Sequence, residues 1–295
     1  MATILMGILE EGFVYAIMAL GVYITYRVLD FPDLSVDGTF PLGGAVTVVL
    51  ISAGVNPLLT LPISFLIGAF AGMLTGLIHV KFKVRDLLAG IIMMTALYSL
   101  NLRIAGRANV PIFSRDTIFE NAFLDKLVPA GFDPFLTASI LFLIILVMKL
   151  LLDWYLKTKS GYLLRAVGDN ETLVTSLAKD KGTIKIIGLS VANAFVALSG
   201  CIYSQKSGFF EISTGTGTIM VGLASVIIGM NLFKKVTFVK ATTAVVIGSI
   251  VYKACVSVAI SLGMAASDLK LITAVLFLLI LIVSNDRKRR VKANA

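Results

Sequence analysis

The chain has 295 residues, of which 58% are hydrophobic and only 15% are charged. A water-soluble domain carries about 25% charged residues, so this composition excludes most soluble proteins, and its hydrophobicity excludes a disordered chain. The net charge of +9 comes from short basic runs between long apolar stretches. That distribution argues against a nucleic-acid-binding face and is typical of charge at a cytoplasmic membrane surface. The sequence therefore predicts an all-α polytopic membrane protein.

About nine apolar segments follow one another along the chain, and the fold is expected to contain eight to ten spans. A transmembrane helix needs about 20 residues to cross the hydrocarbon core. Three segments are shorter than that, 38–54, 217–231 and 270–284, and are candidates for helices that begin inside the membrane. The other segments are 7–26, 57–79, 86–105, 137–155, 184–204 and 240–262.

The basic residues are distributed unevenly between the two sides of the membrane. If the loop at 80–85 lies inside, 18 of the 26 Lys and Arg residues fall inside and six fall outside, with Lys149 and Lys253 within spans. Cytoplasmic loops carry the excess of Lys and Arg. We therefore expect an extracytoplasmic N-terminus and a cytoplasmic C-terminus, a parity that requires an odd number of spans.

Two polar stretches are long enough to carry a function, 106–136 outside the membrane and 156–183 inside it. The inner stretch predicts a short helix at Gly168–Lys179, with residues at its start that can cap it and a glutamate near the positive end of its dipole. Two leucines four residues apart share one of its faces. On spacing alone, an ordinary amphipathic connector is an equal alternative. The residues concerned are Gly168, Asp169, Asn170, Glu171, Leu173 and Leu177.

Two polar runs precede short apolar segments in the same way. The run 30–38 precedes the segment 38–54, and the run 213–218 precedes the segment 217–231. A helix that begins at such a run presents free N–H groups and a positive dipole end, and paired broken helices in two halves of a transporter indicate a substrate path. Two ordinary hairpin loops at the surface are the alternative. The candidate pathway residues are Asp33, Asp37, Gly38, Ser213, Thr214 and Thr216.

Catalytic and metal-binding motifs are absent from the sequence. It contains no phosphate-binding loop of the G-x-x-x-x-G-K-[ST] type, no G-x-S-x-G elbow and no H-E-x-x-H pair. The single histidine, His79, has no second ligand nearby, and Cys201 and Cys255 lie in apolar segments without a C-x-x-C pair. We therefore expect no metal site and no enzymatic activity in this chain.

Three stretches resemble the permease subunits of bacterial ABC importers of the branched-chain amino acid and ribose type. Within that family, FPDLSVDGTFPLGG resembles a subgroup tied to the uptake of aromatic amino acids such as tryptophan or tyrosine. Branched-chain permeases usually carry an Asn-Phe-Ala-His-Gly-like stretch where this chain has residues 32–38, a departure that disfavours leucine or valine as cargo. The three stretches are GVYITYRVLDFPDLSVDGTFPLGG, LLAGIIMMTALYSLNLRIAG and RAVGDNETLVTSLAKDKGTIKIIGLSVANAFVALSGCIYSQKSG.

The resemblance implies a helical bundle like that of type II ABC importer permeases, forming one multi-pass permease domain over residues 1–295 in the bacterial plasma (inner) membrane. It implies a dimer with a second permease copy, surrounded by membrane lipids, around a central pathway. An extracytoplasmic substrate-binding lipoprotein would deliver the solute, and two ABC ATPase subunits would bind ATP and Mg²⁺, so that this chain holds no cofactor. The predicted helix at 168–179 stands where the family has its coupling helix, which inserts into a groove of the ATPase.

Three arginines beside the outer stretch, Arg103, Arg107 and Arg115, are expected to receive the binding protein. They are basic residues on the side where such residues are disfavoured, and complementary charge speeds the encounter with an acidic partner. A solvated loop without a partner is the alternative.

The expected function is transport of a small solute, with an amino acid as the expected class, from the binding protein into the cytoplasm. An ion-coupled secondary transporter is one alternative, and it would use the carboxylates Asp30, Asp33 and Asp37. An ABC importer of a sugar or a nucleoside, and a channel-like or structural membrane protein without an energised partner, are the others.

Overall fold

A computed structural model describes residues 2–121, 133–170, 174–175, 180–234, 236, 238–261, 268, 271 and 273–282. In that part of the chain, seven helices are long and apolar enough to cross a membrane, and two shorter apolar helices, Val36–Ser52 and Thr273–Ile282, accompany them. The predicted all-α membrane fold is confirmed. A count of nine full-length spans is not, because these two helices coincide with the short segments 38–54 and 270–284.

Local signals in the sequence set the ends of the long helices. Helix α3 (Pro57–Lys81) begins after Asn56, whose side chain accepts a hydrogen bond from the N–H of Leu58 at 2.9 Å, and has a proline at its first position. Helices α4 (Asp86–Ala105) and α9 (Lys181–Ser207) each stop at a glycine in the left-handed conformation. Three more of the long helices are α1 (Ala2–Tyr23), α6 (Asp133–Tyr155) and α11 (Ala241–Ser261). The seventh candidate span, Ile212–Leu232, is a short turn followed directly by a helix of 15 residues.

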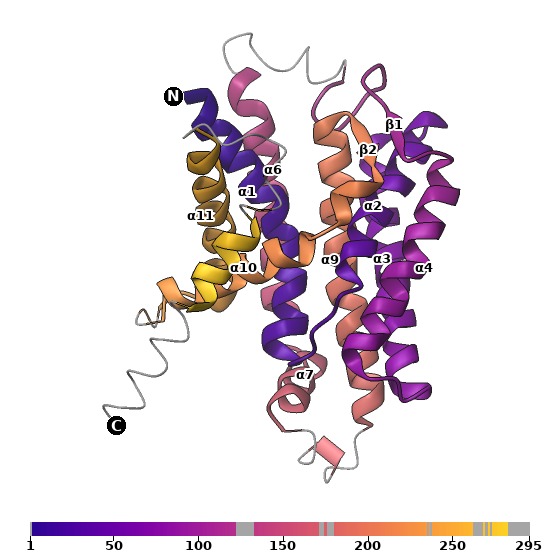
Figure 1. The fold of residues 1–295 in the computed structure, drawn as a ribbon, viewed down its shortest axis with the longest axis vertical. Helices are drawn as coiled ribbons and strands as arrows, with labels where there is room; N and C mark the ends of the chain where they lie inside the picture. Colours follow the sequence, from indigo (N-terminus) through magenta and orange to yellow (C-terminus); the bar gives the residue numbers. More distant parts are fainter. Residues whose placement is uncertain are drawn as a thin grey trace.

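The molecule has two distinct ends (Figure 1). The N-terminus of α1 lies at the same end as strands β1 (Asn109–Pro111) and β2 (Phe209–Glu211), which pair antiparallel with Val110 opposite Phe210. The short helix α7 (Lys159–Asp169) lies at the opposite end. This arrangement agrees with the sides expected from the basic residues, with the β-strand end outside and the α7 end inside.

Helix α9 is the central helix of the bundle, and α1, α2 (Val36–Ser52) and α3 pack against it. A Cβ atom at Gly43 of α2 would overlap the carbonyl oxygen of Ala197, and one at Gly200 would overlap the carbonyl oxygen of Phe40. The backbones of α2 and α9 are therefore in direct contact. Small residues at such contacts are typical of helix packing in membranes, where close van der Waals contact replaces the hydrophobic effect.

Two short helices begin beside each other, and their last turns pack against different elements. Helix α2 follows a π-helical turn, η1 (Ile24–Val28), and helix α10 (Thr218–Leu232) follows a 3-10 turn, η2 (Ile212–Gly215). The last turns of α2 pack on β1 and β2, whereas the last turn of α10 packs through Gly229 against Ala244 near the start of α11. Their first turns meet in the interior of the bundle.

The two ends can be assigned to the two sides of the membrane by cysteine labelling. In a background without Cys201 and Cys255, we expect Ala53→Cys in the turn after α2 to react with a membrane-impermeant maleimide on intact cells. Lys81→Cys at the end of α3 should react only after permeabilisation, because its end carries the basic excess. The reverse labelling pattern would contradict the orientation.

Candidate functional site

The carboxylate of Asp37 joins the two short helices. One of its oxygens accepts a hydrogen bond from the N–H of Gly217 at 2.9 Å, and the other accepts from the N–H of Ile219 at 2.8 Å and from the hydroxyl of Thr218 at 3.0 Å. These groups form the start of α10, where a helix has no acceptor of its own and where its dipole favours a negative charge. Asp37 also lies in the first turn of α2, so one carboxylate faces the positive ends of both helices.

The backbone around this carboxylate is packed closely. A Cβ atom at Gly215 would overlap the carbonyl oxygen of Asp37, so only glycine fits there. Gly217 has a φ of +87°, which a residue with a side chain adopts only at a cost. On the other side, the amide nitrogen of Asn101 in α4 donates to the carbonyl oxygen of Gly38 at 2.9 Å. The first turn of α2 is therefore held between α4 and the start of α10.

Asp33 belongs to a second, buried cluster. One oxygen of its carboxylate accepts from the N–H of Ser35 at 2.9 Å, and the other accepts from the amide nitrogen of Asn193 in α9 at 2.8 Å. The Ser35 hydroxyl donates to the amide oxygen of Asn193 at 3.2 Å. All three residues are buried. This cluster fastens the segment before α2 to the middle of α9.

The two polar runs that the sequence singled out lie together, and they are not two separate surface loops. Ser213 and Thr216 are exposed, Asp37 and Thr214 are partly exposed, and Asp33 and Gly38 are buried. The hydroxyl of Thr214 donates to the carbonyl oxygen of Glu211 at 2.6 Å. The accessible groups at this point are thus a carboxylate and hydroxyls at the surface of the chain, and their part in a pathway stays a prediction.

The predicted start of an inner helix at Gly168 is wrong. Gly168 and Asp169 are the last residues of α7, and Asn170 is its C-cap. The polar run at this point was interpreted as a start signal. Helix α7 begins earlier, at Lys159, after its N-cap Thr158, whose hydroxyl accepts from the N–H of Gly161 at 3.3 Å. The other residues expected in the coupling helix lie outside the described part of the chain: Glu171, Leu173 and Leu177.

Helix α7 packs directly on the turn that ends α1. A Cβ atom at Gly168 would overlap the carbonyl oxygen of Val28 in η1. Next to it, a Cβ atom at Gly188 of α9 would lie 2.6 Å from Leu29 Cδ1 and 2.5 Å from Leu164 Cδ1. The elements α7, η1 and α9 therefore form one close-packed unit at the inner end, immediately before the first polar run.

The three arginines expected at the outer face are all exposed. Arg103 lies in the last turn of α4, and Arg107 and Arg115 lie in the loop beyond it, at the β-strand end. Arg115 also lines a cavity of about 300 Å³, together with Glu10 and Lys206, which form an ion pair at 3.1 Å. These basic side chains are thus accessible at the β-strand end, and their role in receiving a binding protein stays a prediction.

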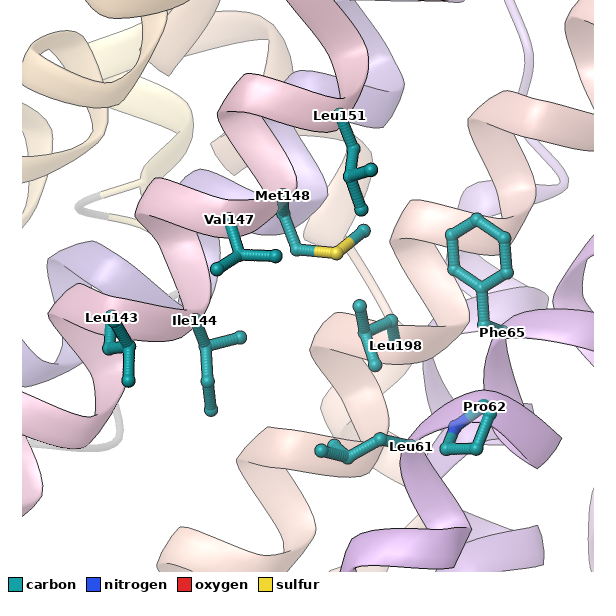
Figure 2. A pocket seen from close by; sticks show the side chains of 9 residues that line it. All are labelled: Leu61, Pro62, Phe65, Leu143, Ile144, Val147, Met148, Leu151 and Leu198. Atoms are coloured by element: carbon teal, nitrogen blue, oxygen red, sulfur yellow. The ribbon is translucent and has the colours of Figure 1, made fainter.

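An apolar cavity of about 400 Å³ lies apart from these polar groups (Figure 2). Its walls come from α3, α6 and α9, and Figure 2 shows Phe65 and Leu198 facing Val147 and Met148 across the opening. No polar side chain lines it, so it offers no hydrogen bond or charge to a polar solute. It is therefore not a candidate for the solute path.

Sequence reasoning missed four residues of this site: Asn101, Asn193, Gly217 and Thr218. The two asparagines carried a usable signal, because a polar side chain in an apolar span is costly unless it has partners and marks a special position. Gly217 and Thr218 belong to the run that was noted, but the pairing of that run with Asp37 joins positions too far apart in the chain to be read from spacing.

Comparison with known proteins assigns the chain to a family. The family described as the branched-chain amino acid transport system / permease component matches residues 4–284. The tyrosine transport system permease protein of Clostridioides difficile is 42% identical over 99% of this chain and 95% of its own length. A more distant relative is the ribose import permease protein of Escherichia coli, which is 28% identical over 76% of this chain and 68% of its own length. Another is a probable branched-chain amino acid transport permease protein of Methanocaldococcus jannaschii, which is 26% identical over 72% of this chain and 70% of its own length. No solved structure matches the chain. The chain thus belongs to the family of permease components of branched-chain amino acid transport systems.

Proposed function

We propose that this chain is the permease subunit of an ATP-driven importer that moves an amino acid across the bacterial inner membrane. The observation that carries the proposal is the 42% identity, over 99% of the chain, with a tyrosine transport permease. The multi-pass helical fold agrees with it. The chain is a transport subunit and not an enzyme.

The proposed cargo class is an aromatic amino acid. The support comes from the tyrosine permease and from the run at 32–38, which departs from the branched-chain pattern. A ribose or other sugar is the second candidate, because ribose import permeases also match, but at 28% identity over 76% of the chain. An ion-coupled mechanism has less support, since the buried carboxylate of Asp33 already accepts from Ser35 and Asn193.

The proposed pathway runs along the surface that carries Asp37, Ser213 and Thr216, at the first turns of α2 and α10. Helix N-termini that meet inside a membrane suit a charged or polar solute, because their dipoles and the polar side chains beside them replace part of its hydration. A second copy of the chain would present the same surface, so the pathway would lie between two permeases of a homodimer.

The proposed partners bind at opposite ends of the chain. The exposed arginines at the β-strand end would receive an extracytoplasmic binding protein through complementary charge. The segment 156–183 at the inner end would meet the ATPase subunits, which supply the nucleotide-binding motif that this sequence lacks. Within this segment, the residues proposed to couple to the ATPase subunits include Glu171, Leu173 and Leu177.

The proposed coupling route starts at α7. Helix α7 contacts η1 at Gly168 and Val28, η1 leads into the segment held by Asp33 and Asn193, and that segment leads into Asp37. A displacement of α7 by the ATPase subunits would be transmitted to the start of both short helices through these close contacts.

A transport assay tests the proposed function. In proteoliposomes that contain the permease, its ATPase subunits and its binding protein, we expect uptake of labelled tyrosine that requires ATP, with competition by tryptophan and not by ribose. Uptake driven by an ion gradient without ATP would contradict the importer, and competition by ribose alone would contradict the amino acid.

Replacing Gly168 tests the coupling route. We expect Gly168→Ala to lower the amount of tyrosine transported per ATP hydrolysed, because the added methyl group overlaps the Val28 carbonyl and separates α7 from η1. The matched control is Gly7→Ala, a helical glycine whose Cβ would meet no atom within 4 Å, and it should behave as wild type. Equal transport ratios for the two variants at normal expression would remove α7 from the route.

A further inference from the structure

A basic cavity of about 510 Å³ lies at the inner end of the molecule, apart from the proposed pathway. It is formed between the turn that joins α3 to α4 and the beginning of α9. The polar and charged residues that line it are His79, Lys83, Arg85, Asp180, Lys181 and Lys185. Four basic side chains thus converge from two parts of the chain that are about a hundred residues apart.

The single carboxylate in this lining is already engaged. Asp180 accepts from the N–H of Gly182 at 2.9 Å and from the N–H of Thr183 at 3.1 Å, as the N-cap of α9. Hydrogen bonds from Thr183 and Gly182 also hold the pKa of this carboxyl below its usual range, so it stays ionised. Nearby, Asp86 accepts from the N–H of Leu87 at 3.0 Å in the first turn of α4. Among the described residues that line the cavity, four basic side chains thus stand against one carboxylate.

The imidazole of His79 contacts both sides of the cavity. The carbonyl oxygen of Val84 can only accept, so the contact at 2.8 Å places the proton on Nδ1 of His79. Its Nε2 then faces the ammonium group of Lys185 at 3.5 Å. The ring also packs edge-on against Phe31, with the ring centroids 5.1 Å apart. These contacts hold Lys185 toward the turn that carries Lys83 and Arg85.

The chain that follows the basic turn carries exposed apolar side chains along α4. Phe82 is 75% exposed, Leu87 is 46% exposed, and Leu88 and Ile92 are each 49% exposed. They begin at the basic turn and follow the face of a membrane-spanning helix. A basic cavity next to an apolar face matches a molecule with an anionic head and hydrocarbon chains. An acidic protein segment would not need this apolar extension.

We propose that this cavity binds the phosphate group of an anionic phospholipid from the inner leaflet, with its acyl chains along α4. Basic pockets between transmembrane helices on the cytoplasmic side are suited to such head groups. The bound phosphate would bridge the α3–α4 turn to the start of α9.

Native mass spectrometry on the full-length chain in detergent tests this proposal. We expect wild-type protein to retain phosphatidylglycerol in preference to phosphatidylcholine, whose head group has no net charge. The variant Lys83→Gln/Lys185→Gln should bind phosphatidylglycerol roughly thirtyfold more weakly, the equivalent of about 1 kcal/mol for each charge removed near an anionic lipid. The matched control, Lys157→Gln/Lys159→Gln, removes two exposed cations at the same end but outside the cavity and should bind as wild type.

The charge-conserving variant Lys83→Arg/Lys185→Arg guards against a simple folding defect and should retain the lipid. Equal lipid binding by the two glutamine variants would overturn the proposal. So would displacement of the lipid by millimolar inorganic phosphate, which would indicate a site for a free anion. Unchanged lipid binding with loss of the ATPase subunits in the cavity variant would show a protein-docking site instead.

Discussion

The contact between Asp37 and the start of α10 is the constraint on which the centre of this structure depends. The first N–H groups of helix α10 have no helical acceptor, Thr218 and Ile219 at this start are buried, and an unpaired buried N–H costs about 1–3 kcal/mol. A carboxylate from the first turn of α2 accepts from Gly217 and Ile219. Without it, two positive helix ends would face each other directly. The two short helices are therefore joined at their starts, while their other ends contact different elements.

Close backbone contacts extend this constraint to the inner end. The segment before α2 is held against α9 by the hydrogen bond between Asp33 and Asn193. The preceding turn η1 packs closely on α7, because Gly168 has no side chain to keep the two backbones apart. Packed elements of this kind shift as units between discrete arrangements rather than bending gradually. A motion imposed at α7 can therefore reach the polar surface around Asp37 with little loss.

Much of this fold could be predicted from the sequence, because transmembrane helices are recognised by the length and hydropathy of their apolar segments. The short segments and the polar runs before them also identified the places where α2 and α10 begin. The contact of Asp37 with Gly217 could not be predicted, since it depends on how helices far apart in the chain pack. The start of α7 after its N-cap Thr158 was missed, because the polar run at Asp169 and the residue after it is the more conspicuous cap signal in the sequence.

Hydrogen exchange at the start of α10 tests the central claim most directly. In wild-type protein, the amides of Gly217 and Ile219 should exchange slowly. In Asp37→Asn they should exchange faster by roughly tenfold to a hundredfold, since a hydrogen bond to a charged group contributes about 1.5–3 kcal/mol. The control Asp30→Asn removes an exposed carboxylate from the same segment and should leave these amides unchanged. Equal exchange in all three proteins would contradict the claim that Asp37 holds the two helices together.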